Sequence, residues 1–201
     1  MKKILPVLIV IPLILAAGCS KAGPPLLKKG EKAVLWESFE QDLYWFAVGN
    51  SWGDGDSSLD ALKVNKFATQ GKYSFKGEYA MNGRNGAAYY VQDFADKDWT
   101  MYKGLGVDIA SDAKEDISVA LALCTGDAWD WQESPSKVVS PGKNPNIRFN
   151  FHDNTLKSQH TDWKHSASLA DANDIKRVVL KFFGKAGING NVYIDNIRLI
   201  K

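Results

Sequence analysis

Three of the seven tryptophans lie in polar, turn-rich segments instead of apolar runs. Trp52 sits within Gly49–Asp56, while Trp129 and Trp131 sit within Thr125–Glu133. Glycine, asparagine and aspartate favour turns, so both segments are predicted to be loops or strand ends. A large apolar ring in such a place commonly serves binding. The alternative is that these rings cap the ends of an apolar core.

Polar side chains near these rings suggest what they would bind. A sugar ring has apolar C–H faces and a fringe of hydroxyl groups, which suit aromatic faces and hydrogen-bonding side chains respectively. Asp127 and Gln132 flank the tryptophan pair, and Arg148, Asn150 and Lys181 alternate with apolar neighbours in two later runs. The pattern predicts a carbohydrate-binding surface, either at loop tips or on a sheet face.

Signatures of catalysis are missing from the sequence. It contains no Gly-x-Ser-x-Gly, no His-Glu-x-x-His and no phosphate-binding loop. The spacing of His152, His160 and His165 fits no short zinc pattern. A glycosidase needs two carboxylates about 5–10 Å apart, to which Glu78 or Asp108 could contribute, but no strand face carries a run of acids. We therefore predict a protein that is not an enzyme.

The N-terminal residues have the pattern of an export signal. A basic start, the apolar run Ile4–Leu15 and small residues precede Cys19. This order is typical of a secretory signal, and the run is short for roughly 30 Å of membrane hydrocarbon. The stretch Leu-Ala-Ala-Gly-Cys resembles a bacterial lipoprotein signal, which implies cleavage before Cys19 and a lipid on it. An ordinary secreted protein is the alternative.

These features divide the chain into three parts. We expect a signal peptide at 1–18, a lipidated cysteine and Pro- and Lys-containing tether at 19–33, and one domain at 34–201. The localisation implied is the bacterial cell envelope, with the membrane reached through the lipid anchor.

Charge and cysteine content exclude other classes. Removing 1–18 takes Lys+Arg from 25 to 23, which equals the 23 Asp+Glu, so the mature chain is formally neutral. A neutral chain has no field to attract nucleic acid. With Cys19 acylated, Cys124 is the one remaining thiol. It cannot form an internal disulfide, so we expect it to pack as a small apolar residue.

The remaining sequence reads as successive strands separated by turns. Period-two alternation or apolar β-rich composition marks each expected strand: Val34–Phe39, Tyr73–Tyr79, Ala87–Phe94, Leu105–Ala110, Ile117–Cys124, Ile147–His152, Arg177–Phe183 and Val192–Ile200. At most Ala61–Thr69 or Ser168–Asp174 suggests a helical turn. Trp36, Trp45, Trp99 and Trp163 are expected in the core. The pattern predicts an all-β sandwich or barrel.

Three pieces of sequence resemble a known family. They are Ser38-Phe39-Glu40, the run from Trp99 to Ile109, and Tyr193-Ile-Asp-Asn-Ile-Arg-Leu199. In this order they are similar to the jelly-roll, galactose-binding-like carbohydrate-binding modules of bacterial glycoside hydrolases. The resemblance implies an all-β jelly-roll sandwich. It also implies a structural Ca²⁺ held by Glu40 and Asp195, although Ser38 stands where family members often carry an acid. Calcium prefers such oxygen ligands.

Together these features predict a function. The expected protein is a non-catalytic, monomeric lipoprotein that binds polysaccharide or oligosaccharide through Trp52, Trp129, Trp131, Asp127, Gln132, Arg148 and Asn150. The first alternative is an envelope protein that uses the sandwich to dock another protein. The second is a glycan hydrolase or lyase.

Overall fold

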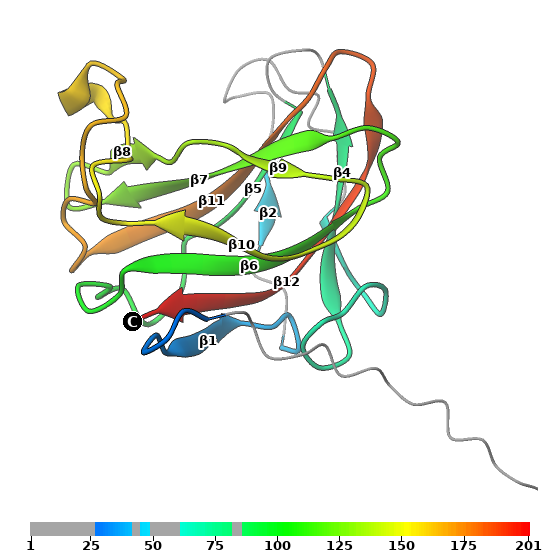
Figure 1. The fold of residues 1–201 in the computed structure, drawn as a ribbon, viewed down its shortest axis with the longest axis horizontal. Coiled ribbons are helices and arrows are strands. Elements are labelled where there is room, and N and C mark those ends of the chain that lie inside the picture. Colours follow the sequence, from blue (N-terminus) through cyan, green and yellow to red (C-terminus); the bar gives the residue numbers. More distant parts are fainter. Residues whose placement is uncertain (1–26, 42–44, 49–60, 82–85) are drawn as a thin grey trace, which may run out of the picture.

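The computed structural model describes residues 27–41, 45–48, 61–81 and 86–201 of the 201-residue chain (Figure 1). Trp52 and Cys19 lie outside these ranges, so the predictions for them stay predictions. No helix among the described residues is long and apolar enough to cross a membrane.

Two antiparallel sheets form the domain, which confirms the all-β sandwich prediction. In one sheet the strand order is β10-β6-β12-β4-β3, with β1 also paired to β12; in the other it is β2-β5-β11-β7-β8, with β9 also paired to β7. We call these the first sheet and the second sheet. The strands are β1 Ala33–Glu37, β2 Phe46–Ala47, β3 Ala61–Val64, β4 Ser74–Ala80, β5 Ala87–Val91, β6 Gly104–Ser111, β7 Ile117–Thr125, β8 Asp130–Glu133, β9 Lys137–Val139, β10 Gly142–Asn150, β11 Ile175–Phe183 and β12 Asn189–Ile200.

The longer strands follow the alternation read from the sequence. In β11, Val178, Leu180 and Phe182 belong to the core, so Arg177 and Lys181 point to the opposite side of the sheet. The predicted helical turn at Ala61–Thr69 is wrong over its first four residues, which form β3 against β4. The short strands β8 and β9 were also not expected. They extend the second sheet by pairing with β7.

Aromatic rings fill one end of the core between the sheets. Trp99 is fully buried and stacks on Phe151, with ring centroids 5.7 Å apart. Trp45 is also buried, and Trp36 packs against the cluster. The core prediction is therefore confirmed for Trp99 and Trp45. It is wrong for Trp163, which is 54% exposed.

Residues just before β1 lie against the first sheet. Lys32 and Lys201 exchange backbone hydrogen bonds of 3.4 and 2.8 Å. The Glu31 carboxylate pairs with Arg148 of β10 at 2.8 Å. The end of the predicted tether is thus fixed to the sheet that does not carry Trp129 and Trp131.

Candidate functional site

The outer side of the second sheet brings aromatic and cationic side chains together. We call Tyr90, Trp129, Trp131, Arg177 and Lys181 the aromatic face. Tyr90 comes from β5, Arg177 and Lys181 from β11, Trp131 from β8, and Trp129 from the turn before β8. The strand between them, β7, turns only small side chains to this side, because its larger ones are in the core. Small central residues leave the longer side chains on both flanks to define the surface.

Arg177 joins the two flanks at one end of this face. Its guanidinium carbon lies 4.8 Å from the ring centroid of Tyr90 and 5.1 Å from that of Trp129. Its Nε and Nη2 donate to Gln92 Oε1 at 3.2 and 2.6 Å. A guanidinium between two rings is held flat, and cation–π contact adds stability. Trp129, 46% exposed, therefore sits on a fixed support.

Lys181 supports Trp131 at the other end of this face. Its Nζ lies 5.4 Å from the Trp131 ring centroid and 5.1 Å from that of Phe183. It also pairs with Glu133 Oε2 at 2.7 Å, and Trp131 Nε1 donates to the same oxygen at 3.2 Å. Trp131 is half-buried, with its indole nitrogen and one ring face engaged by protein groups.

Glu133 stays ionised at neutral pH. Burial alone would raise the pKa of its carboxyl group, but hydrogen bonds from Lys181 and Lys157 outweigh burial and hold the pKa below its ordinary value. The Lys157 pair measures 2.9 Å. A carboxylate held by two lysines is unsuited to donate a proton, so its chemistry here is structural and hydrogen-bonding.

Two further predicted ligand residues lie near the face in different settings. Asp127 is fully exposed in the β7–β8 turn, with Lys176 Nζ 3.8 Å away. Gln132 is buried on the other side of β8. Its Nε2 donates to Thr125 and to the Ala170 carbonyl, and its Oε1 accepts from the Ala170 N–H. The prediction that Gln132 contacts ligand is therefore corrected, because its amide fixes the 151–174 loop to β8.

Arg148 and Asn150 do not join the aromatic face. Both belong to β10 in the first sheet. Arg148 pairs with Glu31, while Asn150 binds Asp153 through Nδ2 and accepts from the His152 N–H at 3.0 Å. Alternation correctly placed both on the outside, but it carries no information about which sheet a strand joins. The structure therefore separates these two residues from Trp129 and Trp131, and a ligand role for Arg148 and Asn150 stays a prediction.

The predicted calcium ligands both clamp the segment between β3 and β4. Glu40 Oε1 accepts from the N–H groups of Lys72 and Tyr73 at 2.8 and 2.7 Å. Asp195 Oδ2 accepts from Thr69 N and Gln70 N at 2.5 and 2.7 Å. No group of three or more His, Cys, Asp or Glu gathers among the described residues. In this arrangement the carboxylates face N–H donors, which does not fit a calcium shell of oxygen ligands.

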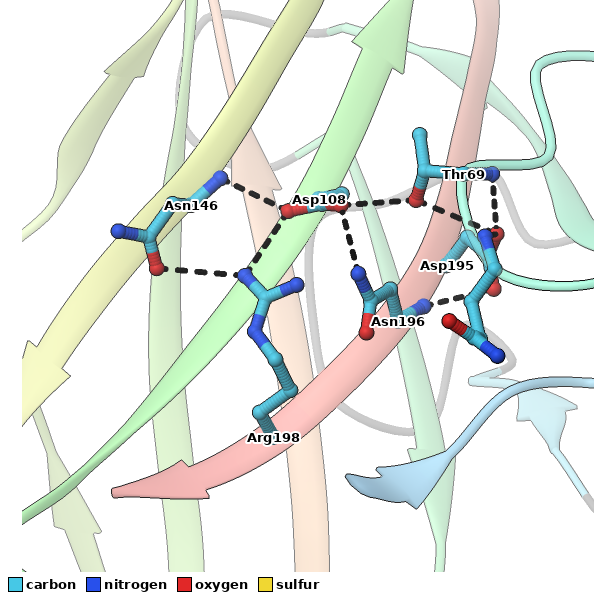
Figure 2. Close-up of polar contacts among 7 residues, drawn as sticks. Thr69, Asp108, Asn146, Asp195, Asn196 and Arg198 are labelled. Carbon is cyan, nitrogen blue, oxygen red and sulfur yellow. Dashed lines mark hydrogen bonds and ion pairs between the residues drawn. The ribbon is translucent and has the colours of Figure 1, made fainter. Parts of the chain in front are cut away.

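A buried ion pair lies beside this clamp (Figure 2). Arg198 Nη2 on β12 pairs with Asp108 Oδ1 on β6 at 2.9 Å, and both side chains are buried. Asn146 N donates to the same oxygen, and Asn196 Nδ2 donates to the other. Burial alone would raise the pKa of Asp108, but the bonds from Arg198 and Asn146 hold it below its ordinary value.

Asp195 gives the domain an expected pH dependence. Burial raises the pKa of Asp195 from 3.8 to about 6, against the lowering effect of its N–H donors. The folded state therefore takes up a proton near pH 6 that the unfolded chain takes up only near pH 4. Stability should consequently rise by about 1 kcal/mol as the pH falls from 7 to 5. Urea unfolding in EDTA at both pH values would measure this, and Asp195→Asn should abolish the rise. A fall in stability over this window would contradict the prediction.

Sequence reasoning missed the residues that support the two tryptophans. Tyr90, Arg177 and Glu133 lie on three different strands, and only the strand order brings them together. Lys181 alone was foreseen as an outward residue of a sheet face. The signal that could have found Tyr90 and Arg177 is the alternation within β5 and β11, once those strands are known to be neighbours.

Comparisons with known proteins agree with this architecture. A family model described as "Mannanase, galactose-binding domain-like" matches residues 39–196. A search of curated protein sequences gives no match. Among solved structures, the chain resembles a family 11 carbohydrate-binding module from Clostridium thermocellum in complex with a β-1,3-1,4-mixed-linked tetrasaccharide, at a TM-score of 0.60 and 14% identity over 83% of this chain and 94% of that one.

Two further structures share the fold. One is a family 28 carbohydrate-binding module specific for non-crystalline cellulose, at a TM-score of 0.57 and 14% identity, covering 84% of this chain and 94% of that one. The other is the agarase AgWH50C, at 0.57 and 10%, where 83% of this chain matches 24% of the enzyme. At these identities the likeness concerns the fold, and it confirms the predicted jelly-roll carbohydrate-binding module architecture.

Proposed function

Because this chain belongs to the galactose-binding-like domain family of mannanases, we propose that it binds polysaccharide through the aromatic face of its second sheet. The observation that carries this proposal is the pair of cation–aromatic units on one side of that sheet, Tyr90–Arg177–Trp129 and Trp131–Lys181. Each unit places an apolar ring beside charged hydrogen-bonding groups, which is the combination that a sugar requires.

The contacts that hold these rings in place favour tight binding of a sugar. Side chains that are ordered before binding lose less conformational entropy when a ligand arrives. Arg177 is fixed by Gln92 and Lys181 by Glu133, so the rings that they contact are restrained as well. The open side of Trp129 is then available to stack on a sugar.

We propose further that the binding is non-catalytic. Glu133, the acid that accepts a hydrogen bond from Trp131, is paired with two lysines and keeps a lowered pKa. An acid that protonates a leaving group needs a raised pKa instead. The alternative of a glycan hydrolase or lyase predicts new reducing ends after incubation with polysaccharide.

A panel of glycans tests the main proposal. We expect mannan, xylan, glucan or galactan to retard the protein in affinity gels, and the matching oligosaccharide to change its tryptophan fluorescence. Blank results across a glycan array and all four gels would overturn the proposal. They would favour the docking alternative, which pull-down from envelope extracts examines.

Lipid anchoring at Cys19 is part of the same proposal. Its support is the signal-like N-terminal sequence. Labelled palmitate should enter the wild-type protein, and Cys19→Ala should remain unlabelled and leave the membrane fraction. Palmitate labelling of the alanine variant would contradict the assignment.

Calcium at Glu40 and Asp195 remains a proposal based on the family resemblance. An ion would have to displace the N–H donors that these carboxylates now accept. If it does, EDTA should lower the melting temperature and added Ca²⁺ should restore it. An unchanged melting temperature would favour the calcium-free clamp.

A further inference from the structure

Two tryptophans combine high exposure with an unfavourable backbone conformation. Trp129 and Trp163 are 46% and 54% exposed, and their φ angles are +57° and +59°. The left-handed region is costly for a bulky residue, by about 1–3 kcal/mol, and such strain concentrates at functional sites. Phe39 and Phe67 also have positive φ angles, but Phe39 is buried and Phe67 packs on Tyr193. Of these four residues, only the two tryptophans combine a strained backbone with a ring exposed to solvent.

The loop that carries Trp163 is fixed along the free edge of β8. Glu133 and Lys157 exchange two backbone hydrogen bonds of 2.9 Å, and Lys157 Nζ reaches the Glu133 carboxylate. Farther along, His160 Nε2 lies 3.2 Å from Asp130 Oδ2. The loop therefore runs antiparallel to β8 from one end of the strand to the other. Figure 1 shows it beyond β8, at the margin of the second sheet.

Backbone hydrogen bonds then hold Trp163 beside this edge. Its N–H donates to the Ser158 carbonyl at 2.9 Å, and the Thr161 hydroxyl bonds the Lys164 carbonyl at 2.7 Å. Asp162, immediately before it, is also left-handed. Hydrogen bonds hold the backbone of this turn in place, so the exposure of the Trp163 ring does not result from a flexible loop.

Trp129 and the turn that presents Trp163 both adjoin Asp130, the first residue of β8. Trp129 directly precedes Asp130, and Asp130 contacts His160 of the turn that presents Trp163. A chain lying on the aromatic face and leaving it past β8 would meet this turn next. Exposed His160, Asp162 and Lys164 supply hydrogen-bonding groups around the ring.

We propose that Trp163 is an additional sugar-stacking residue that extends the aromatic face past β8. This inference rests on the proposed glycan binding and adds that the ligand is an extended oligosaccharide chain. Sugar units that extend beyond the aromatic face contact Trp163, so only longer oligosaccharides gain affinity from this residue.

Affinity measured against chain length tests this assignment. For Trp163→Ala, we expect roughly tenfold weaker binding of the longest members of an oligosaccharide series, equivalent to about 1.4 kcal/mol. Disaccharide binding should stay unchanged. Trp131→Ala should weaken every length, and Met101→Ala, which removes another exposed apolar side chain, should weaken none.

Trp163→Gly separates binding from folding. Glycine adopts positive φ without strain, so this variant should keep or raise the melting temperature while losing the same affinity for long chains. A lower melting temperature with unchanged affinity would give Trp163 a structural role and overturn the inference.

The outcomes also separate this inference from the proposed function. Wild-type binding with equal losses at all lengths, or no loss in Trp163→Ala, overturns the role of Trp163 and leaves the aromatic face intact. Absence of any glycan binding by the wild-type protein overturns both.

Discussion

Asp108→Ala is expected to destabilise the domain by about 3–5 kcal/mol, because it leaves the Arg198 guanidinium buried without its counterion. The wild-type pair measures 2.9 Å between two buried side chains. Arg198 Nε and Nη1 already have no hydrogen-bond partner in the described part of the chain, so the carboxylate is its main compensation. The substitution also removes the acceptor for Asn146 N and Asn196 Nδ2. Urea unfolding at pH 7 measures the loss.

A double substitution is the control for this prediction. Replacing both partners, as in Asp108→Leu with Arg198→Met, removes the stranded charge and should recover much of the loss. A single Asp108→Ala that costs under 1 kcal/mol would show that solvent or another group compensates Arg198, and the ion pair would then not be important for stability.

Trp131→Ala is expected to weaken glycan binding by about 1–3 kcal/mol, the scale for removing an aromatic ring from a binding surface. The ring is half-buried and restrained by Lys181 and Glu133, so a smaller loss of stability should accompany the change. Calorimetric titration and urea unfolding of the same variant measure both quantities.

Trp99→Ala provides the comparison for a true core ring. Trp99 is fully buried, so its removal should cost about 3–5 kcal/mol of stability through a cavity. If Trp131→Ala loses as much stability as Trp99→Ala while its folded fraction binds normally, Trp131 belongs to the core and the ligand role is wrong.

Sequence alternation predicted the longer strands because most of them have one side in the core and one outer side. β7, β10 and β11 were recognised in this way, although their ends differ by a few residues. It failed for β8, whose Asp-Trp-Gln-Glu sequence reads as a polar turn. Pairing with β7 makes it a strand, and that tertiary contact leaves no local pattern.

The candidate site was only partly accessible from sequence. Trp129 and Trp131 were found because large rings in polar segments are conspicuous. Arg148 lies on the other sheet, which the sequence could not show, since period-two spacing separates inside from outside but does not assign a strand to a sheet. Trp163 was expected in the core because its position suggested the start of a late strand. Its exposure follows from a left-handed turn on a loop fixed to β8, which composition does not reveal.

The junction between β1 and β12 determines how the molecule would respond to a pulling force. A force applied to the N-terminal segment would act first on two residues. Lys32 is hydrogen-bonded to Lys201 through the backbone, and Glu31 forms an ion pair with Arg148. The hydrogen bonds of an antiparallel pair are perpendicular to the strands. A force along these hydrogen bonds would therefore break them one after another, starting from the loaded end. Rupture would therefore begin at this corner while the core between the sheets stays packed. The mechanical strength of the domain would be a local property, separate from its thermodynamic stability.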